Sequence, residues 1–272
     1  MQKSLLQADA AYMDQHGKIK VNIYDDEQTT MQTMAKMMVD GIVKNNEQGK
    51  KTLYIVPVGP VNQYPYFVEM VNANKVSLKD VTFINMDEYM EDEKTAVGTE
   101  HELSFKGFME REVYSKIDPE LVMPKEQRIF PETDNGDEID KIIDAHGGVD
   151  CCFGGIGING HVAFNEPPEK DDPITEEAFK DLGVRVQKIA RETRVVNGIG
   201  EYAGAFEFIP EYCITIGFRQ ILRAKKIRLF CMRDWHKGVV KRATFEEASM
   251  HFPVSLLQNH PDTMIGIHKA IM

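Results

Sequence analysis

The sequence has little that would suit a secreted, membrane-bound or nucleic-acid-binding protein. It contains four cysteines among 272 residues and no Cys-x-x-Cys pair. Buried reduced thiols are therefore a simpler interpretation than disulfides or a metal site. No apolar run approaches membrane-spanning length, and residues 1–17 lack the apolar stretch of a secretion signal. The net charge is −11 with no dense basic block, which argues against nucleic acid or anionic membranes as main partners. We expect a cytoplasmic protein that binds a small molecule.

Short apolar runs alternate with helical patterns along the chain. The expected strands occupy residues 19–24, 53–56, 81–84, 149–153, 213–217, 227–231 and 263–268. Met31, Met34 and Met38 recur at helical spacing, which is more typical of core packing than of a ligand site. This alternation implies an open, mainly parallel α/β sheet with helices on both faces. No linker or repeat divides the chain, so we expect a helical arm over residues 1–17 and a single domain over residues 18–272.

Polar segments follow four of the expected strands. Open α/β sheets bind ligands beyond the carboxyl ends of their strands. The corresponding segments are residues 57–63, 85–89, 154–166 and 231–237. We therefore expect the functional site to be built from these four segments.

The stretch from Gly154 to Pro167 combines a glycine-rich turn with several polar side chains. Its G-x-G-x-x-G pattern matches the dinucleotide fingerprint, but that motif must open a helix, and Pro167 and Pro168 would stop one almost at once. A catalytic turn is the better interpretation, because glycines let the backbone approach a substrate closely. His161 can move a proton near neutral pH, and Glu166 can hold its ring in one tautomer. A lone histidine is often a packed residue, but the glycines and carboxylate favour a functional one.

Asp87 and Glu88 give a weaker signal. Acids after a strand are usually helix caps or solvated loop residues. Side chains of adjacent strand residues point in opposite directions, so one of the two should face a site. A carboxylate beside His161 would suit proton abstraction next to a carbonyl or imine.

Arg191, Arg194 and Lys237 are candidate anion ligands. If Asp234 caps the following helix, Lys237 lies in its first turn, where a cation opposes the macrodipole. A bound phosphate or carboxylate would account for a lysine there. A solvated surface lysine is a nearly equal interpretation.

With these residues, the chain resembles the glucosamine-6-phosphate deaminase/isomerase family, whose members have a Rossmann-like α/β fold. The resemblance extends from about Ile19 to the C-terminus. It rests mainly on Phe83-Ile-Asn-Met-Asp-Glu-Tyr89 and the stretch from Gly154 to Pro167, with support from Glu192-Thr-Arg-Val-Val-Asn197 and Lys237. It implies conversion of glucosamine 6-phosphate or galactosamine 6-phosphate to the ketose 6-phosphate and ammonia. It implies no metal or organic cofactor, and we expect a homo-oligomer.

The resemblance also implies a role for each matching residue. Asp87 would take the C2 proton of the opened aldose and return it at C1. His161 would open the sugar ring, with Glu166 tuning it. Asn159 matches a position that is Asp in some members, so its support of ring opening would be a neutral hydrogen bond. The expected substrate-binding residues are Gly59, Glu88, Gly157, Gly160, Arg194 and Lys237, and Arg194 and Lys237 match positions that grip the phosphate.

The main departure from the family lies in residues 58–63. Members usually carry a Gly-Gly-Ser/Thr-Pro loop here, whose amides and hydroxyl hold phosphate. This chain lacks the hydroxyl, and Pro60 removes an amide donor. Phosphate affinity should fall, or the substrate differs at that end. The alternatives are a lactonase or aldose/ketose isomerase of the same fold acting on another sugar, and a non-catalytic sugar-phosphate sensor.

Overall fold

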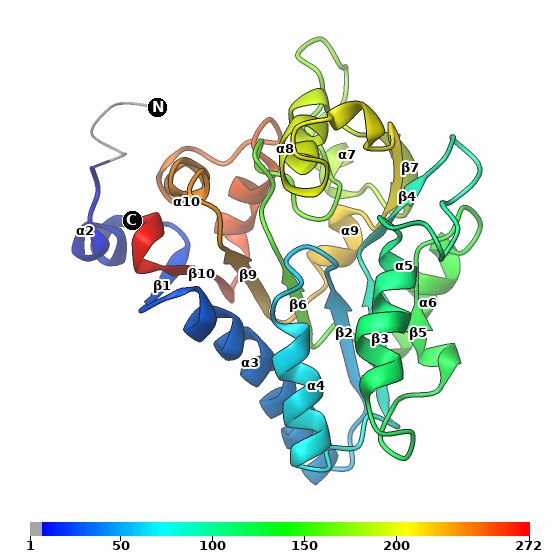
Figure 1. Ribbon diagram of the computed structural model, residues 1–272. Helices are drawn as coiled ribbons and strands as arrows, with labels where there is room; N and C mark the ends of the chain where they lie inside the picture. Colours follow the sequence, from blue (N-terminus) through cyan, green and yellow to red (C-terminus); the bar gives the residue numbers. More distant parts are fainter. Residues whose placement is uncertain (1–6) are drawn as a thin grey trace.

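The computed structural model describes residues 7–272 and is built on a seven-stranded parallel sheet (Figure 1). Its strand order is β1-β10-β9-β6-β2-β3-β5. These strands are β1 (Lys20–Tyr24), β2 (Thr52–Val56), β3 (Val81–Asn85), β5 (Arg128–Ile129), β6 (Cys151–Gly154), β9 (Ile227–Cys231) and β10 (Thr263–His268). All neighbouring pairs in this sheet are parallel, which confirms the predicted open α/β architecture.

Alternating side chains of the central strands pack into two separate cores. Leu53 and Ile55 of β2 contribute to one core, while Tyr54 and Val56 contribute to the other. Successive strand residues point to opposite faces, so a run that is apolar throughout indicates a sheet covered on both faces. Helices therefore lie on both sides of the sheet, as predicted.

Two helices that pack side by side cover one face, and a second set covers the other (Figure 1). The first are α3 (Glu27–Glu47) and α4 (Tyr64–Ala73), joined by α5 (Phe105–Phe108), the π-helical Met109–Val113 and the 3-10 turn Tyr114–Lys116. The second set is α6 (Gly136–His146), α9 (Phe218–Ile221), α10 (His236–Phe245) and the 3-10 turn Pro253–Asn259. Further 3-10 turns span Lys125–Gln127, Phe206–Phe208 and Lys269–Ile271. The methionine stripe of α3 is buried, as its spacing predicts.

A second, antiparallel sheet has the order β4-β8-β7. It comprises β4 (Asp87–Met90), β7 (Arg185–Lys188) and β8 (Tyr212–Thr215), with α7 (Glu176–Lys180) and α8 (Arg191–Glu201) nearby in the chain. The predicted strand at residues 213–217 thus lies outside the parallel sheet. Apolar alternation reports burial of a strand but does not identify its pairing partner, which is why the sequence did not distinguish this sheet.

The ends of several helices agree with their sequence signals, and one does not. Helix α6 ends at Gly147 with φ of 76°, a left-handed geometry that suits glycine. Helix α10 begins at His236, and Asp234 provides no side-chain cap, so that part of the prediction is wrong. Of the expected N-terminal arm, α2 (Ala10–His16) is helical and buries Met13. The rest, residues 1–6, lies outside the described residues.

All four cysteines are unpaired and buried, which confirms their predicted state. Each lies in a strand: Cys151 and Cys152 in β6, Cys213 in β8 and Cys231 in β9. Within residues 7–272, none of the helices combines the length and the apolar character that a membrane span requires.

Candidate active site

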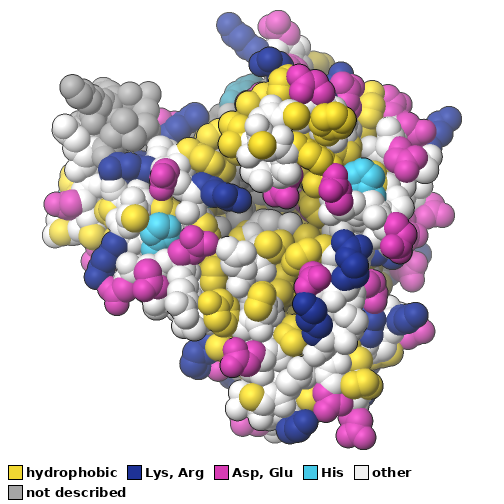
Figure 2. Space-filling model, in the orientation of Figure 1, with side chains coloured by type: hydrophobic (Ala, Val, Ile, Leu, Met, Phe, Trp, Pro, Cys, Tyr) yellow, Lys and Arg dark blue, Asp and Glu magenta, His cyan; other side chains and the backbone are white. Residues whose placement is uncertain are grey.

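The main cavity lies at the carboxyl ends of β2, β3, β6 and β9 and has a volume of about 630 Å³. It is lined by residues from all four predicted segments, 57–63, 85–89, 154–166 and 231–237. Strand order reverses between β2 and β6, so the cavity occupies the topological switch point where ligands of open α/β sheets bind. The surface is hollowed in this region, below the lobe that carries α8 (Figure 2).

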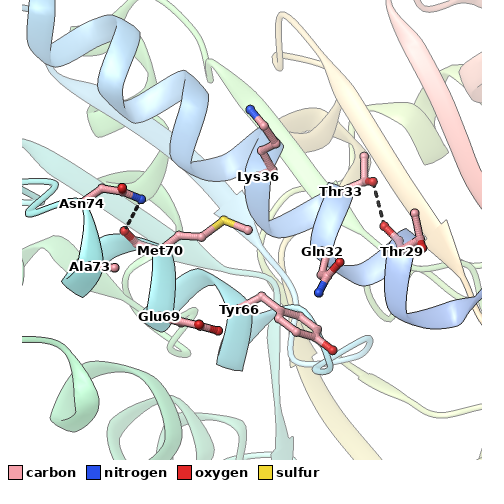
Figure 3. Close-up of a pocket in the computed structure, with 9 residues that line it drawn as sticks. All are labelled: Thr29, Gln32, Thr33, Lys36, Tyr66, Glu69, Met70, Ala73 and Asn74. Atoms are coloured by element: carbon pink, nitrogen blue, oxygen red, sulfur yellow. Dashed lines mark hydrogen bonds between the residues drawn. The ribbon is translucent and has the colours of Figure 1, made fainter.

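A second depression, of about 470 Å³, lies between α3 and α4 (Figure 3). Its polar groups include Thr29, Thr33, Lys36 and Glu69, which belong to the exposed surface of the two helices. The Thr33 hydroxyl is already used in a hydrogen bond to the Thr29 carbonyl oxygen. With no buried acid or base among its lining residues, this groove is not a candidate for catalysis.

The glycine-rich turn brings His161 against the cavity wall. The Gly157 amide donates to the His161 carbonyl oxygen at 2.9 Å, and a Cβ on Gly157 would lie 1.9 Å from His161 Cε1. Gly160 has φ of 85°, and its added Cβ would lie 2.6 Å from the Phe252 ring. No helix opens from the turn, since the next one along the chain is α7, and this confirms that the pattern is not a dinucleotide motif.

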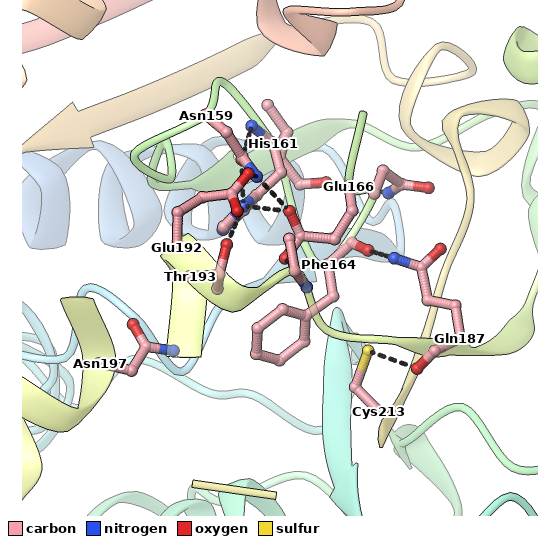
Figure 4. A network of polar contacts seen from close by, with 12 residues as sticks. Asn159, His161, Phe164, Glu166, Gln187, Glu192, Thr193, Asn197 and Cys213 are labelled. Carbon is pink, nitrogen blue, oxygen red and sulfur yellow. Dashed lines mark hydrogen bonds and ion pairs between the residues drawn. The ribbon is translucent and has the colours of Figure 1, made fainter. Parts of the chain in front are cut away.

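Asn159, His161 and Glu166 form a compact polar network (Figure 4). His161 Nδ1 lies 2.8 Å from Asn159 Oδ1 and 3.2 Å from Glu166 Oε2. Asn159 Nδ2 donates to Glu166 at 2.6 Å and to Glu192 at 3.1 Å. Because both nearby oxygens are acceptors, Nδ1 carries the proton, and the neutral ring keeps Nε2 as its basic nitrogen.

Opposing effects set the charge states of His161 and Glu166. Burial alone lowers the pKa of His161, but the Glu166 carboxylate, with Asp87 and Glu192, raises it overall. Burial likewise raises the pKa of Glu166, but His161, Asn159 and Thr193 bring it below its usual value. Glu166 is therefore held as an anion that supports a cationic imidazole.

Asp87 occupies the first position of β4, where the chain leaves the parallel sheet after Met86. Its side chain lines the cavity and is 7% exposed. Burial raises its pKa to about 8, with His161 opposing the shift and Glu88 adding to it. A carboxylate with a raised pKa is a stronger base than an ordinary aspartate, once it is ionised.

Glu88 does not line the cavity, in contrast to its expected role in substrate binding. Its carboxylate accepts hydrogen bonds from the Phe105 and Lys106 amides at 2.9 and 2.8 Å and from the Ser104 hydroxyl at 2.9 Å. The Tyr89 amide is a fourth donor at 2.9 Å. These contacts fix the start of α5, and they follow from the opposite orientation of adjacent strand residues, of which Asp87 faces the cavity.

The basic residues expected to hold an anion are directed elsewhere. Arg194 donates to the Ile209 carbonyl oxygen at 3.2 Å and pairs with Glu211 at 3.1 Å. The Arg191 guanidinium lies over the Phe206 ring. Lys237 is exposed, does not line the cavity, and its charge acts on Lys241, on the inner side of α10. None of the three contacts the cavity in this structure.

Helix α8 supplies functional residues that the sequence analysis did not single out individually. Thr193 and Asn197 line the cavity, and Glu192 joins the Asn159 network. Asn197 also donates to the Tyr89 hydroxyl at 3.0 Å. Their signal was the stretch from Glu192 to Asn197, in which helical spacing turns Thr193 and Asn197 to the cavity and Arg194 away from it.

Comparisons with known proteins agree with this arrangement. No family model matches the chain. A glucosamine-6-phosphate deaminase from Aliivibrio fischeri (strain MJ11) is 29% identical over 215 residues, 77% of this chain and 75% of that protein. A glucosamine-6-phosphate deaminase from Rhodopirellula baltica is 26% identical over 259 residues, 93% of this chain and 94% of that protein.

Solved structures share the fold. A structure described as a monomeric glucosamine-6-phosphate deaminase superposes with a TM-score of 0.78 at 21% identity, covering 93% of this chain and 98% of that one. A 6-phosphogluconolactonase from Shewanella baltica has a TM-score of 0.64 at 13% identity, covering 92% and 97%.

The chain therefore shares its open α/β fold with these solved structures, and it places a buried acid–imidazole network in a cavity at the switch point of that fold. In sequence the chain is similar to glucosamine-6-phosphate deaminases at 26–29% identity, which agrees with the family resemblance of its motifs.

Proposed function

We propose that this protein is an amino-sugar deaminase/isomerase that converts a 2-amino-2-deoxyaldose to the ketose and ammonia. Glucosamine 6-phosphate and galactosamine 6-phosphate, the substrates implied by the family, are the first to test. The observation that carries the proposal is that buried Asp87 and His161 line one cavity and perturb each other's pKa. Two such groups suit proton transfers at adjacent carbons of one substrate.

Ring opening comes first. His161 Nε2 takes the proton of the anomeric hydroxyl and returns it to the ring oxygen as the C1–O5 bond breaks, which leaves an open-chain aldehyde. The imidazole carries a positive charge between the two transfers. Glu166 stabilises that charge, and Asn159 holds the ring through Nδ1.

Isomerisation follows at C2 and C1. Asp87 takes the C2 proton, the C–H electron pair forms the C1=C2 double bond, and the aldehyde oxygen gains a proton to give an enolamine. Asp87 then returns its proton to C1, and the nitrogen lone pair forms a C2=N iminium. Water adds to C2, and ammonium leaves as the ketone forms, so aldosamine, water and a proton give ketose and ammonium.

The test measures two products of the same incubation. Ammonia release from a panel of amino-sugar phosphates reports the whole reaction, and deuterium exchange at C2 in heavy water reports the Asp87 step. Undiminished ammonia release from Asp87→Asn would contradict the role of Asp87, whereas release without exchange would mean that the proton passes from C2 to C1 on this carboxylate. A lactonase would show neither, and folded protein that binds the sugars without turnover would be a sensor.

Three further predictions stay part of this proposal: the division into an arm and a domain, a cytoplasmic location and a homo-oligomer. A solved relative is described as monomeric. Sedimentation of the purified chain would decide the last point.

A further inference from the structure

The mouth of the cavity is dominated by acidic side chains. Glu27, Glu102, Glu201 and Asp234 line it, and all four are exposed. Among the described lining residues, Arg233 is the one Lys or Arg. A phosphate dianion entering here would meet four carboxylates and one guanidinium.

Two of these carboxylates are held in place by neighbouring side chains from other segments of the chain. Asn62 Nδ2 donates to Glu27 Oε1 at 2.9 Å, which fixes Glu27 beside the loop after β2. The Tyr202 hydroxyl contacts Glu102, which fixes that acid against the end of α8. Their negative charges are therefore held at the rim by hydrogen bonds.

The side chains of the loop after β2 offer little to an anion at this end. Val58, Gly59, Pro60, Val61 and Asn62 line the cavity, and none of them carries a hydroxyl or a positive charge. Pro60 also lacks an amide proton and packs against the glycine turn, where a Cβ on Gly155 would lie 2.9 Å from Pro60 Cδ. The side-chain nitrogen of Asn62, Nδ2, already donates a hydrogen bond to Glu27.

The basic side chains that could offset the negative charge of the mouth make contacts elsewhere. Arg194 is bound to Ile209 and Glu211, Arg191 lies over Phe206, and Lys237 lies outside the cavity lining. Arg233 remains at the mouth, near α8, since a Cβ on Gly200 would lie 3.8 Å from its guanidinium. Glu201 of α8 and the adjacent Asp234 share that rim.

We propose that the substrate is an amino sugar whose end remote from C1 and C2 is uncharged, with a hydroxyl in place of the phosphate. This inference rests on the proposed function, because the reacting end of the site is the same for both substrates. An uncharged end loses nothing to the acidic rim, whereas a phosphate is repelled by it and finds no hydroxyl and no basic side chain in the loop after β2.

The test compares kcat/KM for ammonia release from glucosamine and galactosamine with that from their 6-phosphates, at low ionic strength. We expect the unphosphorylated sugars to have the higher kcat/KM. Preference for a 6-phosphate would overturn this inference and leave the proposed function intact. No ammonia from any of the four, with folded protein, would overturn the proposed function itself.

A variant with an uncharged mouth tests whether the acidic side chains cause this preference. In the variant Glu27→Gln/Glu102→Gln/Glu201→Gln, the hydrogen-bond acceptors remain and three charges are lost. We expect kcat/KM for the 6-phosphates to rise about tenfold, because the repulsive field is removed. The value for the unphosphorylated sugars should change less than twofold. Equal changes for both substrate types would contradict a charge-based selection.

Glu207→Gln is the matched control. Glu207 lies in the 3-10 turn after α8, is exposed and does not line the cavity. This variant loses one negative charge outside the mouth, against three in the mouth variant, and should change kcat/KM for neither substrate type. An equal gain for the 6-phosphates in Glu207→Gln would assign the effect to net charge and overturn the role of the mouth.

Discussion

The two ends of the cavity are built in different ways. At the reacting end, Asp87 and Glu166 are 7% and 8% exposed, and hydrogen bonds and burial fix the charge of each group. At the mouth, the acids Glu27, Glu102, Glu201 and Asp234 are exposed to solvent. Buried groups with shifted pKa values serve chemistry, whereas exposed charges select which ligand enters. The same fold can therefore keep one reaction while its substrate changes.

The largest effect is expected at the base. Replacing Asp87 by Asn removes the proton acceptor and should lower kcat more than a thousandfold, as general-base loss usually does. C2 deuterium exchange should vanish with ammonia release, while substrate binding persists. Asp80→Asn, an exposed acid just before β3, is the control and should retain full activity. Exchange that survives in Asp87→Asn would assign the C2 proton to another group.

Replacing Asp87 by Asn should also stabilise the fold. Asp87 has a pKa of about 8 in the folded protein against an ordinary value of 3.8 for an aspartate, so folding disfavours its ionised form. Below pH 3.8 the group is neutral in both states and contributes nothing. Stability is then lost as pH rises from 3.8 towards 8. At pH 8 we expect Asp87→Asn to be more stable than the wild type by about 2 kcal/mol in denaturant titrations.

Activity should show a matching pH dependence. Asp87 must be ionised to take the C2 proton, so kcat/KM should rise roughly tenfold per pH unit up to about pH 8. The measurement is kcat/KM for ammonia release between pH 5.5 and 9.5. If kcat/KM were already independent of pH at pH 5.5, Asp87 would have an ordinary pKa and an environment more open than in this structure.

Glu88 is expected to contribute to the stability of the fold and not to substrate binding. Glu88 accepts hydrogen bonds from two amides and a hydroxyl at the start of α5 and from the Tyr89 amide in β4, so Glu88→Ala should cost about 3 kcal/mol of unfolding free energy. Glu91→Ala, an exposed acid in the next loop, should cost less than about 0.5 kcal/mol. Chemical denaturation measures both. If Glu88→Ala left the stability unchanged and raised KM, Glu88 would contribute to substrate binding instead.

Asn159 is coupled to Glu192 through a shared hydrogen bond. Replacing Asn159 by Asp would put three carboxylates within contact of one another, since Asn159 now donates to Glu166 and Glu192. We expect Asn159→Asp to lose about 1–2 kcal/mol of stability, and Glu192→Gln to restore most of it in the double variant. A double-mutant cycle in thermal denaturation measures this coupling, and additive effects would contradict it.

The sequence predicted the parallel sheet and the segments that form the cavity, because burial on both faces and polar strand ends leave clear local signals. It also singled out Asp87, His161 and Glu166. It did not predict the antiparallel sheet or the contacts of Glu88 and Arg194. Those depend on which way a side chain turns and on partners distant in sequence, such as Glu211 for Arg194. A match to a family motif at one position predicts the residue type there but not the direction of its side chain.

The smallest effect is expected at Lys237, and it tests the mouth directly. Lys237 is exposed and does not line the cavity, so Lys237→Ala should change KM less than twofold for either phosphorylated or unphosphorylated sugars. Arg233→Gln is the matched comparison, because Arg233 does line the mouth and its loss should raise KM for the 6-phosphates more than for the parent sugars. If Lys237→Ala instead raised KM for the 6-phosphates tenfold, the lysine would reach a bound phosphate. The two ends of the cavity would then both follow the family pattern.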